Sequence, residues 1–212
     1  TNQYDVPTIV QMRKAEAEEA AMSIGAVYHE SIGRDLDIYY ERSLLAQLSS
    51  IVREVAPDII LTHSPIDYME DHTNTCRLAT SAAFARGMPN YEVVPPRQAI
   101  DKRVTVYHAQ PYSHFDPLRS LVQPDLFVDV TSKEDDKVAM LAKHSSQKRW
   151  LDESQGLDSY LQTLRVLDAR CGNMSGCFVY AEGWRRHLHL GFCDEHDDPL
   201  QEALAEFIHR PE

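Results

Sequence analysis

The stretch from Asp58 to Ser64, DIILTHS, decides the fold of this chain. Its apolar centre is followed directly by polar residues, which is typical of a buried parallel strand whose carboxyl end opens into a site. Pro57 stands just ahead of it and favours the end of a preceding helix. Because ligands of open α/β sheets bind at the carboxyl ends of the strands, the residues after Ser64 are the first candidates for a site.

The segments on both sides of this strand alternate between helical and extended patterns. Apolar periodicity predicts helices over residues 8–24, 40–55, 71–86, 133–149, 157–167 and 200–208. Strands are predicted over 26–29, 103–110 and 126–130, a strand or extended segment over 177–184, and a Pro-rich loop over 88–102. The alternation predicts an open, mostly parallel α/β sheet with helices on both faces, in a single domain covering residues 1–212.

Length and composition exclude several classes of protein. The chain has 212 residues, of which 43% are apolar and 25% charged, a balance typical of folded globular domains. No apolar run approaches the ~20 residues of a membrane span. The formal charge of −12 argues against a nucleic-acid partner. The four cysteines form no CxxC pair, and we expect them to be reduced thiols of a cytoplasmic protein. We expect a small-molecule substrate, with homo-oligomerisation left open.

The densest group of chemically active residues follows the Asp58–Ser64 strand. Residues 62–72, THSPIDYMEDH, contain two histidines and three carboxylates between a strand and a helix start. An imidazole there is a good zinc ligand, and a neighbouring carboxylate can orient it. The alternative is an acidic helix start in which Asp71 is the cap and His72 is partly exposed. The residues alone leave both interpretations open.

Three segments resemble, in the same order, the signatures of the LmbE-like, or PIG-L, deacetylase family. PDIILTHSPIDYMEDHTNTCRLATSAAF (57–84) resembles its strand, Thr-His and loop ending in Asp-His. MRKAEAEEAAMSIGAVYH (12–29) resembles its R-x-x-E-x-x-x-A-x-x-x-G helix, with shifted spacing. KVAMLAKHSSQ (137–147) resembles its K-x-x-x-L-x-x-H-x-S-Q segment. The likeness covers about residues 13–192 and implies a Rossmann-like fold of the LmbE type.

The resemblance also implies a Zn²⁺-dependent hydrolase that removes an acyl group, usually acetyl, from an amino-sugar conjugate. On this basis His72 is the predicted metal ligand. Asp71 is predicted to bind substrate or orient a ligand, and His144 to give acid or oxyanion support. His63 is a candidate to orient His72 or Asp71.

Three residues are predicted to contact substrate. His108 ends the 103–110 strand, and Tyr68 lies in the loop before His72. Arg185 belongs to YAEGWRRHLHLGF (180–192), which offers an aromatic ring and guanidinium groups for a substrate rim. The alternative for that segment is an alternating edge strand with solvated basic residues.

The chain departs from the family in two places. The family's A-H-P-D-D-E motif, which supplies two further zinc ligands and the general base, does not occur in these residues. Because the chain opens with a polar stretch and a helix, we expect a first strand ahead of Thr1. The second departure is Met69, where many relatives have a histidine.

Two alternatives follow from these departures. One is a non-catalytic relative whose cleft binds a saccharide or a protein partner. The other is a rearranged metal site built from His63, His72, His108 and His144.

Overall fold

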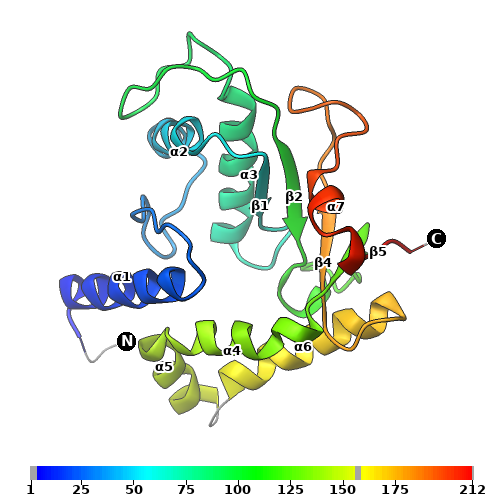
Figure 1. Ribbon diagram of the computed structural model, residues 1–212. Coiled ribbons are helices and arrows are strands. Elements are labelled where there is room, and N and C mark those ends of the chain that lie inside the picture. The colour runs from blue at the N-terminus through cyan, green and yellow to red at the C-terminus, as the bar shows by residue number, and fades with distance from the viewer. Residues whose placement is uncertain (1–3, 156–158, 212) are drawn as a thin grey trace. The chain divides into compact units, whose positions relative to one another are not determined.

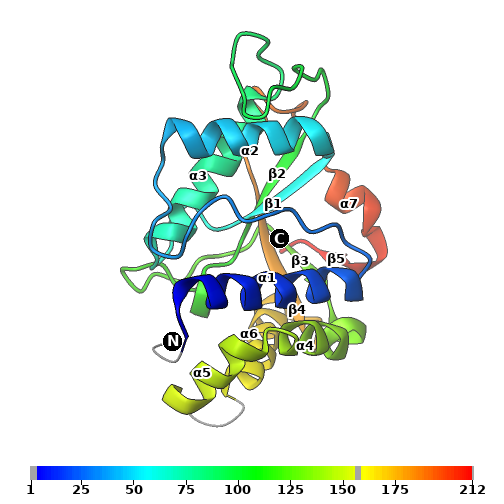
Figure 2. The same ribbon diagram turned by 90° about the vertical axis from the view of Figure 1, so that its left-hand side faces the viewer.

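A computed structural model describes residues 4–155 and 159–211 of the chain (Figures 1 and 2). The chain divides into two compact units, a helical unit of residues 1–30 and 129–181 and a sheet unit of residues 31–128 and 182–212. The single domain over residues 1–212 stays a prediction. Within the described ranges, every helix is too short or too polar to pass through a bilayer.

The sheet unit is built on an open sheet of five strands in the order β1-β2-β4-β3-β5. The strands are β1 (Ile59–Thr62), β2 (Thr105–Ala109), β3 (Leu126–Asp129), β4 (Ala181–Arg186) and β5 (Ile208–His209). β1 and β2 are parallel, whereas β4 is antiparallel to β2 and β5 to β3. The predicted open α/β sheet is confirmed, with strand directions more mixed than expected because apolar patterning does not encode direction.

Helices cover both faces of β2, as predicted. α2 (Arg42–Val55) and α3 (Glu70–Ala85) lie on one side of β1 and β2 (Figure 1). Neighbouring strand residues point to opposite faces. His108 faces α3, since its Nδ1 lies 3.4 Å from Cys76 Sγ. Tyr107 faces the other way and donates its hydroxyl proton to Asp198, the N-cap of α7 (Pro199–Ala203), at 2.6 Å.

The core of the sheet unit lies between β2 and α3. Val104 and Val106 pack with Ala83 and Phe192, and all four are buried. Small buried residues on α3, among them Ala82, Ala83 and Ala85, let the helix approach the sheet closely. The carboxyl ends of β1 and β2 are thereby held side by side.

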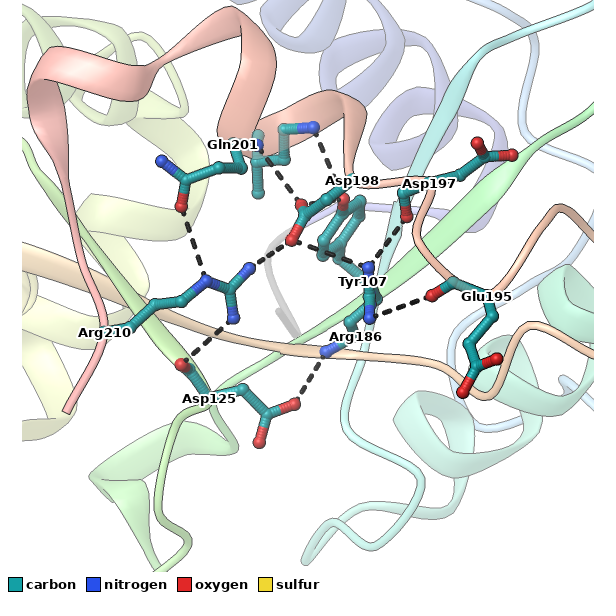
Figure 3. Close-up of polar contacts among 9 residues, drawn as sticks. Tyr107, Asp125, Arg186, Glu195, Asp197, Asp198, Gln201 and Arg210 are labelled. Atoms are coloured by element: carbon teal, nitrogen blue, oxygen red, sulfur yellow. Dashed lines mark hydrogen bonds and ion pairs between the residues drawn. The ribbon is translucent and has the colours of Figure 1, made fainter. Parts of the chain in front are cut away.

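Charged side chains fix the C-terminal segment against the face of the sheet opposite α3 (Figure 3). The Asp198 carboxylate accepts the Tyr107 hydroxyl proton and pairs with Arg186 and Arg210. Arg186 also donates to the backbone oxygen of Asp197, and its own backbone N–H donates to Asp125 at 2.9 Å. Burial, and then the bond to Asp198, raises the pKa of Tyr107, so its hydroxyl stays protonated. These hydrogen bonds and ion pairs hold α7 against the sheet and fix the position of β4.

The predicted Pro-rich loop 88–102 contains neither helix nor strand, which confirms that prediction. Two buried arginines fix it and its flanks. Arg53 of α2 donates to a row of backbone carbonyls, those of Ala85, Arg86, Met88, Tyr91 and Arg97. Arg86 donates to the carbonyls of Ala83, Lys102, Gly191 and Phe192. Because backbone oxygens satisfy both cations, burial leaves no unpaired charge at either position.

The helical unit contains α1 (Val6–Ser23), α4 (Glu134–Ala142), α5 (Ser145–Gln155) and α6 (Ser159–Ser175). The prediction of one helix over 133–149 is wrong, because the helix is interrupted between the end of α4 and the start of α5. The Glu16 carboxylate accepts the Ser146 backbone N–H at 2.7 Å and both hydroxyls of Ser145 and Ser146. The contact with Glu16 of α1 therefore caps the start of α5, at a point where the apolar periodicity of the sequence predicts that one helix continues.

Three other predictions about elements are wrong. Residues 26–29 form no strand, and Val27 is 82% exposed. The strand or extended segment predicted at 177–184 begins only at Ala181, because the Ser175 hydroxyl accepts the Phe178 N–H and holds the preceding residues in a turn. The helix predicted at 200–208 ends at Ala203, because Ile208 pairs with β3. Leu157, which helped to predict the helix at 157–167, lies outside the described residues.

Short 3₁₀ turns complete the described structure. They cover Tyr112–His114, Thr131–Lys133 and Ala205–Phe207.

Candidate metal and substrate site

The loop after β1 is organised by the carboxylate of Asp67. Its Oδ1 accepts the backbone N–H of Met69 at 3.1 Å and the Nδ1–H of His72 at 2.9 Å. The Asp67 side chain is only 2% exposed, so water competes little for these bonds. The N-cap of α3 is Met69, which makes no side-chain cap. Asp71 is therefore not the cap, although the first turn of α3 is acidic and His72 is partly exposed, as that alternative expected.

The bond to Asp67 leaves His72 with the chemistry of a metal ligand. When Nδ1 carries the proton, Nε2 presents a lone pair. A carboxylate behind the imidazole fixes this tautomer and makes the ring a better ligand. The His72 side chain keeps 29% of its surface exposed, so the ring remains accessible.

Aromatic rings surround His72. His63, directly after β1, stacks on it with ring centroids 4.4 Å apart and planes inclined by 4°. The Tyr68 ring meets His72 edge-on at 5.7 Å and lies 6.0 Å from Tyr112. Burial and the neighbouring His72 lower the pKa of His63, so its ring is neutral near pH 7. Burial and Asp67 raise the pKa of Tyr68, which keeps a hydroxyl proton to donate.

Asp71 is buried and faces another segment of the sheet unit. Its Oδ2 accepts the backbone N–H of Leu36 at 2.6 Å. One turn later, the Asn74 amide donates to the carbonyl of Ile38 at 2.9 Å. α3 therefore anchors the loop from residue 31 to 41 beside the start of the helix. The predicted catalytic role of Asp71 stays a prediction.

His108 lies in a buried hydrogen-bonded chain and is only 5% exposed. Its Nδ1 lies 3.0 Å from the carbonyl oxygen of His63, so Nδ1 carries the proton and donates it. Its Nε2 then accepts from His187 Nδ1 at 2.9 Å. Burial lowers the pKa of both rings, so both are neutral near pH 7. This geometry favours support of the His63 backbone over the predicted substrate contact.

Arg185 lies on β4, between β2 and β3, and is paired in register with His108. The alternative of a solvated edge strand is therefore wrong. Its Nη2 donates to the Ser64 hydroxyl at 2.8 Å, and Ser64 precedes the turn that carries Asp67. Burial lowers the pKa of the guanidinium, which still stays charged at any ordinary pH.

His144 lies in the helical unit, between α4 and α5, and its side chain is half-buried. Its carbonyl accepts the Lys148 N–H as α5 begins. Its predicted catalytic role stays a prediction.

His72 is the metal-ligand candidate with the right chemistry, and it needs partners. Over residues 4–155 and 159–211, no three His, Cys, Asp or Glu side chains are placed to hold one metal ion. The rearranged site of His63, His72, His108 and His144 therefore finds no support in this part of the chain.

Comparison with known proteins identifies the family. Residues 1–83 match the family described as PIG-L: GlcNAc-PI de-N-acetylase. Solved deacetylases with the LmbE-like fold match the chain in structure. Residues 1–83 thus match the PIG-L, or LmbE-like, family, and the chain shares the fold of the solved deacetylases. The resemblance inferred from the three sequence segments is confirmed.

Proteins similar to this chain include hydratases as well as deacetylases. A 4-oxalmesaconate hydratase from Pseudomonas putida is 31% identical over 138 residues, which are 64% of this chain and 51% of the relative. The chain thus spans about half the length of that curated relative.

Solved structures share the fold at low identity. The 4-carboxy-2-hydroxymuconate hydratase from Pseudomonas putida has a TM-score of 0.65 at 24% identity, covering 93% of this chain and 78% of that one. The N,N'-diacetylchitobiose deacetylase from Pyrococcus horikoshii has a TM-score of 0.66 at 22% identity, covering 91% and 68%. These matches establish the fold of the chain.

Sequence reasoning missed Asp67 as the residue behind His72 and chose Asp71 or His63. The available signal was weak, because three carboxylates lie within the same short loop. Only the path of the turn from Pro65 to Met69 decides which of them reaches the imidazole.

Replacing Asp67 by Asn is expected to weaken metal binding by the intact protein about 10–100-fold, because the ligand imidazole loses its carboxylate partner. The fold is expected to survive, since the amide oxygen can still accept the Met69 N–H. Competition with a chromogenic chelator measures the affinity. Glu70→Gln removes a neighbouring exposed carboxylate and serves as the control. Equal affinities for Asp67→Asn and the unmodified protein would contradict the assigned role.

Proposed function

We propose that the intact protein is a zinc-dependent deacetylase that hydrolyses the N-acyl amide, most simply N-acetyl, of an amino-sugar conjugate. The observation that carries this proposal is the Asp67–His72 pair at the carboxyl end of β1, bonded at 2.9 Å. The match of residues 1–83 to the PIG-L family and the fold shared with deacetylases support it.

The residues of this chain would act by binding and orientation. A bound zinc ion lowers the pKa of a coordinated water to about 7 and polarises an amide carbonyl. His72 Nε2 would be one ligand, held in its tautomer by Asp67. The Tyr68 hydroxyl would donate a hydrogen bond to the substrate. Because the described residues contribute one ligand, we assign the activity to the intact protein.

A second candidate is the hydration of an unsaturated carboxylic acid. The relative that is 31% identical carries the name of a hydratase, whereas the solved deacetylases are 15–22% identical to this chain. Both reactions add a water molecule to the substrate. They differ in the substrate group that the water attacks, an amide carbonyl or a carbon–carbon double bond.

Two assays on the zinc-loaded intact protein test these candidates. One measures acetate released from N,N'-diacetylchitobiose, and the other measures loss of ultraviolet absorbance by 4-oxalmesaconate. We expect acetate release that a chelator abolishes and added zinc restores. Turnover of oxalmesaconate alone would replace the deacetylase assignment with the hydratase one. Binding of a saccharide with neither turnover would support the non-catalytic alternative.

A cytoplasmic location and homo-oligomeric assembly remain predictions of this proposal. The four cysteines are free thiols, which agrees with a reducing compartment.

A further inference from the structure

Arg185 is unusual among the arginines of the sheet unit. A guanidinium presents a planar fork of N–H donors and no acceptor. Arg53 and Arg86 direct their donors to several backbone carbonyls, and Arg186 bonds Asp197 and Asp198 (Figure 3). Among the described residues, Arg185 makes one hydrogen bond, to Ser64, and its buried Nε has no partner. Arg185 is half-buried, and a buried donor of a cation that lacks a partner is costly unless an anion or another acceptor completes it.

A second unmatched group lies at the same edge of the sheet. Gln110 follows β2 directly, and both its amide nitrogen and its amide oxygen are buried without a partner in the described part of the chain. Arg185 is paired with His108, two residues before Gln110 on the neighbouring strand. By the two-residue alternation of an extended chain, Gln110 and His108 share a face. Two groups that need partners therefore converge on the carboxyl end of β2.

Ser64 connects this edge to the candidate metal ligand. Its hydroxyl donates to the Ile66 carbonyl at 2.7 Å, so its oxygen is turned to accept from Arg185. The preceding residue, His63, stacks on His72. Ser64 thus binds the Arg185 guanidinium directly after His63, whose ring stacks on His72.

We propose that Arg185 and Gln110, with Ser64 holding the guanidinium, form a subsite that binds a carboxylate of the substrate. A carboxylate pairs with the guanidinium fork through two parallel hydrogen bonds, and Gln110 can donate a further one. The claim that this subsite binds part of the substrate beside His72 rests on the proposed function. The claim that it binds a carboxylate is independent of the proposed function.

The charge of the subsite favours a carboxylate over a phosphate. Arg185 supplies one positive charge, which the nearby Asp125 carboxylate partly offsets, and the neighbouring rings of His108 and His187 are neutral near pH 7. One guanidinium balances the single charge of a carboxylate, whereas a phosphate group carries about −1.5 to −2 near pH 7. The substrate class is thus an amino-sugar conjugate that also carries a carboxylate.

Titration calorimetry of the purified, zinc-free chain with malonate tests the proposal. We expect binding that weakens about 10-fold or more in Arg185→Met, because a charged hydrogen-bonded pair is lost. Arg185→Lys keeps the positive charge but lacks the planar guanidinium. Its affinity for malonate is expected to lie between those of the unmodified chain and Arg185→Met. Gln110→Leu keeps the size and is expected to weaken binding about 5-fold. It also keeps the proposal testable if Arg185→Met fails to fold.

Arg103→Met is the matched control, since Arg103 is exposed and stands ahead of β2, at the other end of the strand. Unchanged malonate binding in Arg185→Met or Gln110→Leu, or no binding by the unmodified chain at 20 mM (about the upper range of weak ligands), would overturn the proposal. Inorganic phosphate binding more tightly than malonate would overturn the choice of a carboxylate. His72→Ala is expected to bind malonate normally, so failure of the metal site is separable from failure of this subsite.

Discussion

The His72→Ala variant of the intact protein is expected to lose its zinc and its turnover together. An alanine removes the imidazole whose free nitrogen is the proposed ligand, and no described side chain lies placed to complete a replacement set. Loss of a residue behind a ligand costs about 10–100-fold in affinity, so loss of the ligand itself is expected to exceed 10²-fold. Elemental mass spectrometry of the purified protein measures the bound zinc, and the deacetylase assay measures turnover.

His196→Ala provides the control, because His196 is exposed and lies in the loop ahead of α7. It is expected to retain both zinc and activity. The fold of His72→Ala is expected to persist, since Asp67 still accepts the Met69 N–H. Full zinc occupancy in a folded His72→Ala protein would refute the assignment of His72 as a ligand.

The Arg53→Met variant is expected to show the largest loss of stability. Methionine keeps the aliphatic stem of the side chain but leaves a row of buried carbonyls without their donor. Each unsatisfied buried acceptor costs about 1–3 kcal/mol, and local rearrangement recovers part of the sum. We expect a loss of about 3–5 kcal/mol in the free energy of unfolding, which urea denaturation measures.

Arg97→Met is the matched comparison for Arg53. Arg97 pairs with Glu54, and both side chains are more than a third exposed. An exposed ion pair contributes ~0–1 kcal/mol, so this variant is expected to unfold close to the unmodified protein. Similar urea midpoints for Arg53→Met and Arg97→Met would show that the loop from 88 to 102 does not depend on Arg53.

The family and the place of the site were predictable from local sequence. DIILTHS forms a strand that ends in polar residues, and the apolar run shows this before any contact is known. The Asp-His pair at the start of α3 marks His72 because it is carried by a contiguous motif. Tyr68 was placed beside His72 for the same reason, since short loops keep neighbours in sequence close in space.

Partners that come from distant segments were not predictable. The helix expected over 133–149 breaks where Ser146 meets Glu16, and that contact joins residues 130 positions apart. The C-terminal Arg185 was predicted to reach substrate, yet the sequence did not distinguish a central strand from a solvated edge. Strand order decides this, and strand order is a property of the assembled sheet.

The sequence by itself determined the helix-and-strand alternation and the match to the PIG-L family, and it predicted His72, because each rests on residues within one segment. Only the tertiary structure decided that Asp67 is hydrogen-bonded to His72 and that His108 bonds His63 and His187. It also decided that, among the described residues, Arg185 and Gln110 keep buried polar atoms without a partner. The physical reason is that hydrogen-bond satisfaction is settled by the whole fold. Which buried donors find partners depends on how separate segments meet, and no local pattern records that.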